Sequence, residues 1–129
     1  MHIHERHNIL MHKNIEITPS IKESIQDKKG HKIAVIDLAA LGVSNASKFI
    51  ICQGNSTSQV SAIADSIRDK VLETCHRKPL NYDGYRNSEW IILDYGDVFA
   101  HIFLPDIRLR YNLEELWGDA PIEYIPDLD

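Results

Sequence analysis

Three polar residues in the C-terminal half have the types and spacing of a metal or acid/base site. Asp94 and Asp97 stand on either side of a Tyr95-Gly96 dipeptide, and His101 follows four residues later. Two carboxylates and an imidazole this close together can hold a metal or exchange protons with a substrate. Dense apolar runs flank them, so they could equally be the polar residues of a hairpin that has only a structural role.

The geometry of a β-hairpin argues against a metal shared by all three side chains. If Tyr95-Gly96 is a two-residue turn, Asp94 faces Asp97 and Trp90 pairs with His101. Strand residues at about 3.3 Å each then place His101 roughly 13 Å from Asp97. The two aspartates alone could still bind Mg²⁺ together with substrate phosphates. Asp and Gly are also ordinary turn residues, and the sequence favours that interpretation.

Side-chain alternation also divides the predicted hairpin into two faces. One face is wholly apolar and should belong to the core: Ile91, Leu93, Val98, Ala100 and Ile102. The other mixes aromatic, aliphatic and polar residues: Trp90, Ile92, Asp94, Asp97, Phe99, His101 and Phe103.

Two further motifs fall short of a catalytic set. Gly54 opens the stretch GNSTSQ before a predicted helix, and such an end can attract an anion. The stretch lacks the lysine of a P-loop and the three glycines of a dinucleotide fingerprint, so a helix cap explains Ser56 and Ser58. Cys52 lies in an apolar run that should raise its pKa, and local spacing places no histidine beside it.

Composition indicates a single globular domain. The chain has 129 residues, 43% hydrophobic and 26% charged, which is ordinary for such a domain. No apolar run approaches the ~20 residues of a membrane span. Two cysteines make no disulfide framework, and we expect reduced thiols and a cytoplasmic location.

Four of the seven histidines lie in the first dozen residues. They could bind a metal, but no stable element is predicted there to fix their geometry.

Charge is distributed unevenly along the chain. Residues 1–81 carry 11 basic and 8 acidic side chains, whereas residues 82–129 carry 3 basic and 11 acidic ones. An acidic half repels nucleic-acid phosphates and attracts a basic protein surface, although it could also be a solvated face without a partner. Aromatic residues crowd the same half, and Trp and Tyr often anchor protein interfaces.

Local patterns predict a mixed α/β domain. Thr18 and Pro19 begin a helix with an Ile17, Ile21, Ile25 stripe, and residues 32–38 and 47–54 form strands. A long helix follows Ser56 or Ser58, and its apolar positions are Val60, Ile63, Ala64, Ile67, Val71 and Leu72. Residues 79–85 form an edge strand that could support a homodimer. Asn112 caps a short helix, with Glu115 completing a capping box.

These elements give an organisation of an N-terminal tail (1–16), one α/β domain (17–121) and an acidic, extended tail (122–129). We expect a mixed sheet of roughly five strands with flanking helices.

Four stretches together resemble the Iojap family, the ribosomal silencing factors called RsfS in bacteria. They are GNSTSQVSAIAD, YDGY, EWIILDYGDVFAHIF and RYNLEELWGDA, and the resemblance runs from about Thr18 to Pro121. Two departures stand out. The chain has Asp83-Gly84 where the family usually has Glu-Gly. It has Ser47-Lys48 where the family tends to have an Asp-aromatic pair, and a ribosome contact there could differ.

The resemblance implies a nucleotidyltransferase-like fold without the paired catalytic carboxylates, no cofactor, and a non-enzymatic role. Family members bind a ribosomal protein on the joining face of the large subunit, block small-subunit association and lower translation when nutrients are short. We expect a docking surface formed by Tyr95, Asp97, His101, Tyr111, Glu114 and Trp117. Two alternatives stay open: a metal-dependent nucleotidyl or phosphoryl transferase using Asp94, Asp97 and the GNS turn, and a large-subunit biogenesis factor. Direct contact with ribosomal RNA is also left open.

Overall fold

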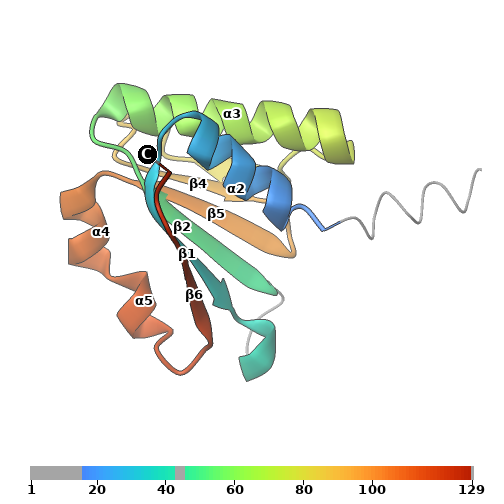
Figure 1. Ribbon diagram of the computed structural model, residues 1–129, viewed down its shortest axis with the longest axis vertical. Coiled ribbons are helices and arrows are strands. Elements are labelled where there is room, and N and C mark those ends of the chain that lie inside the picture. The colour runs from blue at the N-terminus through green and yellow to red at the C-terminus, as the bar shows by residue number, and fades with distance from the viewer. Residues whose placement is uncertain (1–15, 43–45, 129) are drawn as a thin grey trace, which may run out of the picture.

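The computed structural model describes residues 16–42 and 46–128 as a single sheet with helices on both faces (Figure 1). The four N-terminal histidines, His2, His4, His7 and His12, lie outside the described residues. The elements in chain order are α2 (Thr18–Asp27), β1 (His31–Asp37), a 3₁₀ turn (Ala39–Leu41), β2 (Lys48–Gln53), α3 (Thr57–Cys75), β3 (Asn81–Asp83), β4 (Trp90–Asp94), β5 (Val98–Phe103), α4 (Pro105–Tyr111), α5 (Leu113–Leu116) and β6 (Ile122–Ile125). None of these helices is long and apolar enough to cross a membrane.

The sheet has six strands in the order β3-β4-β5-β2-β1-β6. Only the central pair, β2 and β5, is parallel, and the other neighbours are antiparallel. The mixed α/β class predicted from the sequence is therefore confirmed. The sixth strand is β6, which pairs with β1 through partners such as Ile36 and Ile122. The sequence predicted an extended tail there, and its few alternating residues gave no sign of this long-range pairing.

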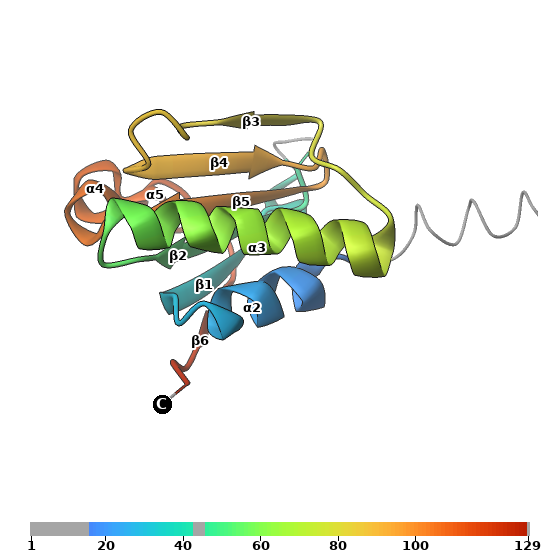
Figure 2. The same cartoon turned by 90° about the horizontal axis from the view of Figure 1, so that it is seen from above.

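The two faces of the sheet carry different helices (Figure 2). On one face α2 and α3 bury a large aliphatic cluster, in which Ile21, Ile25, Ile63 and Ile67 are fully buried. On the other face α4 and α5 cover a smaller cluster around Ile36, and its partly buried members are mostly aromatic or aliphatic residues of the C-terminal third. The sheet is therefore the middle of three layers.

The beginning of each long helix follows from local chemistry, although one cap differs from the prediction. Ser56 is the N-cap of α3, and its hydroxyl accepts a 3.1 Å hydrogen bond from Gln59 N, as predicted. Thr18, in contrast, is the first residue of α2 and caps nothing. The Glu16 carboxylate accepts hydrogen bonds from the Thr18 backbone and hydroxyl instead, so an acidic side chain does what the sequence assigned to a threonine.

The hairpin of β4 and β5 has the predicted faces but a different register. Asp94 pairs with Phe99 and Trp90 with Phe103. The Tyr95 N–H donates to the Val98 carbonyl at 3.0 Å, so the turn is at Gly96-Asp97 rather than at Tyr95-Gly96. The predicted pairs Asp94 with Asp97 and Trp90 with His101 are therefore wrong by two positions. A shift of two preserves which side chains share a face, and Ile91, Leu93 and Ala100 are buried as expected.

The last two helices also depart from the prediction. The sequence indicated one short helix after Asn112, whereas the structure adds α4 before it and joins the two at Asn112, whose φ is 46°. Asn112 makes no N-cap hydrogen bond, and its side-chain amide donates to the Glu115 carboxylate at 2.7 Å. The predicted capping box is therefore absent from this corner.

Candidate docking surface

The six predicted docking residues do not form one surface. Tyr95 follows β4 and points into the α2–α3 side of the core, where only 2% of its surface is exposed. Burial raises the pKa of its hydroxyl to about 12. The hydroxyl has no hydrogen-bond partner among the described residues. In this conformation Tyr95 supports the fold from within, and a partner cannot reach it.

Asp97 lies in the turn after Tyr95, where it forms an ion pair with Arg77. Arg77, just beyond α3, donates to both carboxylate oxygens of Asp97, at 2.8 and 3.2 Å, and to the Tyr95 carbonyl at 2.6 Å. Burial pushes the pKa of Asp97 upward, but the hydrogen bonds and charge of Arg77 outweigh it, so the pKa lies below the ordinary value. The aspartate therefore ties the hairpin to the end of α3.

His101 lies on the opposite face of the sheet, the one that α4 and α5 cover, and is 4% exposed. Its ring is surrounded by aromatic rings, with the Phe49 centroid at 4.6 Å, and its Nδ1 accepts a 3.2 Å hydrogen bond from the Trp90 indole. Burial lowers the pKa of His101 to about 4, so the ring is neutral at pH 7. His101 orients Trp90 from inside and is not a surface residue.

Tyr111, Glu114 and Trp117 lie together on the outer helical layer of α4 and α5. Tyr111 is 52% exposed and packs against Trp90, with ring centroids 4.8 Å apart. Trp117 is half-buried and meets Phe49 edge-on. Glu114 accepts a 3.1 Å hydrogen bond from Nε of Arg108. Of the six predicted residues, these three form a shared outer surface.

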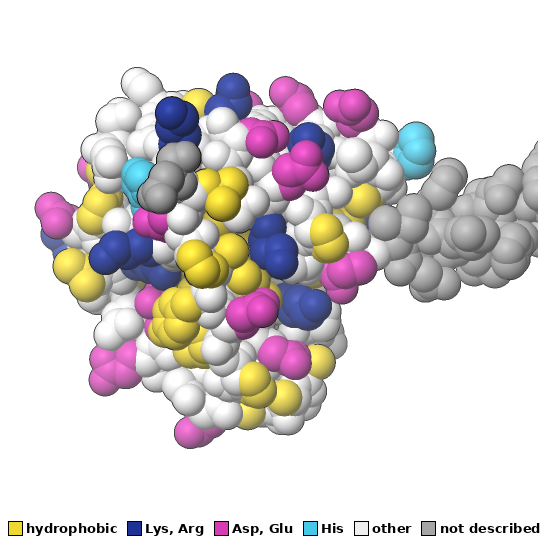
Figure 3. Space-filling model, viewed as in Figure 1, with side chains coloured by type: hydrophobic (Ala, Val, Ile, Leu, Met, Phe, Trp, Pro, Cys, Tyr) yellow, Lys and Arg dark blue, Asp and Glu magenta, His cyan; other side chains and the backbone are white. Residues whose placement is uncertain are grey.

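Sequence reasoning missed exposed apolar residues beside them. Leu109, Leu116 and Tyr124 are 78%, 69% and 63% exposed. Leu104, Ile107 and Tyr111 follow a helical stripe toward the sheet, which leaves Leu109 on the outer side and could have revealed it. Residues 105–129 carry seven acidic and two basic side chains. Figure 3 shows hydrophobic side chains gathered beside β6, with both acidic and basic side chains around them.

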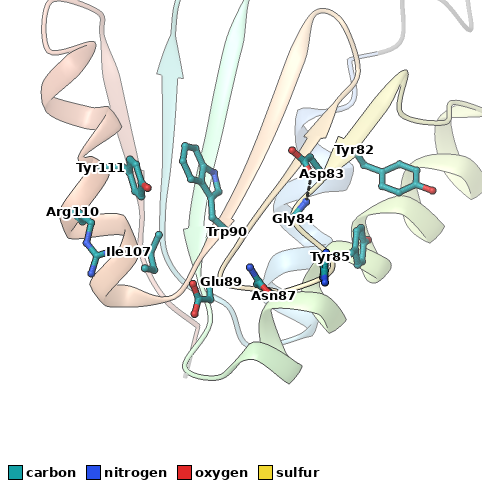
Figure 4. Close-up of a pocket in the computed structure, with 11 residues that line it drawn as sticks. Tyr82, Asp83, Gly84, Tyr85, Asn87, Glu89, Trp90, Ile107, Arg110 and Tyr111 are labelled. Carbon is teal, nitrogen blue, oxygen red and sulfur yellow. Dashed lines mark hydrogen bonds between the residues drawn. The ribbon is translucent and has the colours of Figure 1, made fainter.

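We call the group Tyr111, Glu114, Leu116 and Trp117 the α4–α5 surface. Beside it, a groove of about 570 Å³ separates α4 from the loop between β3 and β4 (Figure 4). Trp90 and Tyr111 lie along this groove, and Glu89 and Arg110 are at its rim. Gly84 has φ +98°, and a Cβ there would lie 2.0 Å from the Trp90 carbonyl oxygen. Only glycine allows the loop to approach β4 this closely.

Ser47 and Lys48, which replace the Asp-aromatic pair of the family pattern, both make contacts within this chain. The Ser47 backbone and hydroxyl both donate to the Asp97 carbonyl, at 2.6 and 2.9 Å. Lys48 pairs with Glu16 at 3.5 Å. Ser47 therefore reinforces the same turn that Arg77 holds.

The groups proposed for a transferase lie at opposite ends of the central strand. Ser47, just before β2, donates to the Asp97 carbonyl, whereas Gly54, just after β2, donates to Phe103 O. A strand of this length separates Asp97 from the GNS turn by roughly 20 Å. Among residues 16–42 and 46–128, no group of three His, Cys, Asp or Glu could hold a metal. The fold and surface define a small α/β domain that offers a face for contact.

Comparisons with known proteins agree with this class. The family model described as ribosomal silencing factor during starvation matches residues 12–129. The ribosomal silencing factor RsfS of Bacillus subtilis is 41% identical over 103 residues, covering 80% of this chain and 83% of that protein. RsfS of Halalkalibacterium halodurans is 37% identical over 108 residues, with coverages of 84% and 91%. A crystal structure from Chromobacterium violaceum has a TM-score of 0.74 at 34% identity, and covers 79% of this chain and 83% of that one.

The chain therefore belongs to the RsfS/Iojap family of ribosomal silencing factors. Membership makes it a non-enzymatic factor and implies association with the ribosome. The transferase alternative is thereby set aside.

Proposed function

We propose that the protein binds a basic ribosomal protein on the joining face of the large subunit and blocks association of the small subunit by its bulk. Translation falls as a result when nutrients are limiting. The role needs no chemistry, because a body bound where two large surfaces must meet excludes one of them.

The observation that carries the proposal is the exposure of large apolar side chains within an acidic region. Leu116 is 69% and Tyr111 52% exposed, in a segment where acidic side chains outnumber basic ones seven to two. Tyr and Trp supply much of the binding energy in protein interfaces, while complementary charge speeds and orients docking. A basic partner with an apolar centre fits this combination.

Of the other predicted residues, His101 supports this surface from within, whereas Tyr95 and Asp97 lie elsewhere. His101 fixes Trp90 by a hydrogen bond, and Trp90 packs against Tyr111. Asp97 and Tyr95 belong to the hairpin turn at the far end of the same strands. We infer that Tyr111, Glu114, Leu116 and Trp117 contact the partner. His101 supports them from inside, whereas Tyr95 and Asp97 stabilise the hairpin turn.

Co-sedimentation with purified large subunits tests the proposal. Leu116→Lys places a positive charge in the α4–α5 surface, and should weaken binding about tenfold or more. Leu80→Lys is the matched control, because Leu80 is 70% exposed but lies beside β3, and this variant should bind as the parent does. Binding should also fall with salt. If both variants bind equally, or the parent protein fails to co-sediment at low salt, the proposal is wrong.

Two features of the partner interaction stay predictions. The exposed edge strand β3 could pair with a second copy, and ribosomal RNA could lie next to the docked protein. Mass measurement in solution tests the first, and cross-linking on the large subunit tests the second.

A further inference from the structure

A second cavity lies away from the groove of Figure 4, between α4 and the end of β6. Its volume is about 530 Å³, within the ~300–1,000 Å³ typical of small-ligand sites. Its walls are largely apolar and include Ile33, Leu109, Tyr124 and Ile125. Arg108 and Lys32 bring positive charge to the same cavity. We call it the Arg108 cleft.

The cleft lies where open α/β sheets commonly bind ligands. The parallel strands β2 and β5 end at Gln53 and Phe103. From these ends the chain leaves toward opposite faces of the sheet, into α3 after β2 and into α4 after β5 (Figures 1 and 2). A crevice forms outside the carboxyl ends of strands where connections diverge in this way. Gln53 and Pro105 line the cleft from the two sides of that divergence.

Arg108 is the unusual group of the cleft, since a guanidinium that is 7% exposed requires partners for its donors. Nε bonds to Glu114 at 3.1 Å, and Nη1 bonds to the Lys32 carbonyl at 2.6 Å and to Gln53 at 3.3 Å. Nη2 has no acceptor among the described residues. The only fully buried side-chain atoms without a partner in those residues are on Tyr95 and His101, so Nη2 keeps some exposed surface, and Arg108 lines the cleft.

The two acidic residues of the cleft are already engaged. Glu114 holds Arg108 Nε, and Asp127 accepts the Lys32 backbone N–H at 2.7 Å and pairs with His31 at 3.6 Å. The charged donors that remain for a ligand are the Nη2 group of Arg108 and the ammonium group of Lys32. Such donors recognise an acceptor that carries negative charge.

We propose that the Arg108 cleft binds a carboxylate that carries an apolar body. The carboxylate accepts hydrogen bonds from Arg108 Nη2 and Lys32, and the body packs between Leu109 and the β6 residues Tyr124 and Ile125. The carboxylate belongs either to a free small acid or to the C-terminus of another polypeptide, because the two offer the same chemistry. The proposal does not rest on the ribosomal docking proposed above, although Glu114 borders both sites.

Binding of phenylbutyrate, followed by calorimetry and by NMR shifts, tests the proposal with the full chain. Saturable binding with a Kd of about 1 mM or tighter is expected, with shifts at Arg108 and Leu109. The neutral phenylbutyramide and acetate should each bind about tenfold more weakly. A dipeptide ending in phenylalanine distinguishes the sources: tighter binding than phenylbutyrate supports a chain terminus, and weaker binding supports a small acid.

Variants separate the cleft from a nonspecific effect. Leu109→Glu should weaken phenylbutyrate binding about tenfold, whereas Leu116→Glu, an equally exposed leucine outside the cleft, should not. Arg108→Lys keeps the charge but loses Nη2, and should also weaken binding if its NMR spectrum shows a folded protein. Equal binding of acid and amide, equal effects of the two leucine variants, or no saturation would overturn the proposal.

Discussion

The two faces of the sheet differ in what covers them. Under α2 and α3 the core is a continuous set of fully buried aliphatic side chains, in which Ile21, Ile63 and Ile67 have no exposed surface. Under α4 and α5 the smaller cluster includes many partly buried members, such as Phe49, Trp90 and Trp117. The first face has the closed packing that stabilises a fold, whereas the second leaves large aromatic surface within reach of a partner.

This difference supports our proposal that one face serves stability and the other serves recognition. The helices α2 and α3 have 10 and 19 residues, long enough to shield their half of the sheet. The helices α4 and α5 have 7 and 4 residues and shield theirs only in part. Among the described residues, the shorter pair carries three exposed large apolar side chains, Leu109, Tyr111 and Leu116, whereas the longer pair carries only Leu72.

The largest expected effect comes from removing an aliphatic side chain on the closed face. Ile67→Ala should lower the free energy of unfolding by about 2–5 kcal/mol, because it leaves a cavity in a fully buried cluster. Leu116→Ala, on the open face, should change it by less than about 0.5 kcal/mol. Urea denaturation measures both. Similar losses in the two variants would break the distinction between the faces.

A pH effect of intermediate size should come from His101, on the open side of the sheet. Its folded pKa of about 4 is below the unfolded value of ~6.5. Between these pH values the imidazole is protonated in the unfolded chain but not in the folded one. The free energy of unfolding is therefore unaffected by His101 above pH ~6.5 and falls as pH decreases below it. From about pH 7 to pH 5 this group should remove about 2 kcal/mol.

His101→Phe isolates that contribution, because phenylalanine fills the aromatic site without titrating. The loss of stability between pH 7 and pH 5 in urea denaturation should be smaller in this variant than in the parent protein. Identical pH profiles for the two proteins would show that His101 is not buried as a neutral ring.

The smallest effect on stability should come from the hydrogen bonds that Arg77 donates to the hairpin turn. Arg77→Ala removes the bonds to Asp97 and the Tyr95 carbonyl, and should lower stability by about 1 kcal/mol at pH 7, since Asp97 is half exposed. The lowered pKa of Asp97 means that its contribution is present above its unfolded pKa and disappears as pH falls through the folded one. The difference between parent and variant should therefore shrink in strongly acidic solution, where the bond to the Tyr95 carbonyl is the part that remains.

Lys48→Ala is the control for this comparison. It breaks a surface pair with Glu16 at 3.5 Å, and such a pair contributes little. Thermal unfolding should show a smaller loss than for Arg77→Ala. A larger loss would mean that the bonds of Arg77 do not hold the turn.

The sequence predicted the parts of the fold that depend on local pattern. The stripe of α3, the Ser56 cap and the faces of the β4–β5 hairpin follow from periodicity and capping chemistry, and the structure has them. The strand pairing of β6 and the separate helix α4 depend on contacts with distant parts of the chain. The displacement of the turn from Tyr95-Gly96 to Gly96-Asp97 was also invisible, because Asp and Gly suit either turn.

Burial was the property of the candidate site that the sequence could not supply. Tyr95 and His101 are polar residues next to exposed turns in sequence, yet both lie inside. Their burial comes from residues far away in the chain, such as Phe49 on β2 against His101. Tyr111 and Trp117, in contrast, lie on short amphipathic helices, where local pattern and exposure agree.

Hydrogen exchange of the protein bound to large subunits tests the division between the two faces most directly. We predict that amide hydrogen exchange in residues 105–125 is slower in the bound protein than in the free protein. The exchange rates in α3 (57–75) should be the same in both. Protection concentrated on α3, with residues 105–125 exchanging as in the free protein, would contradict it.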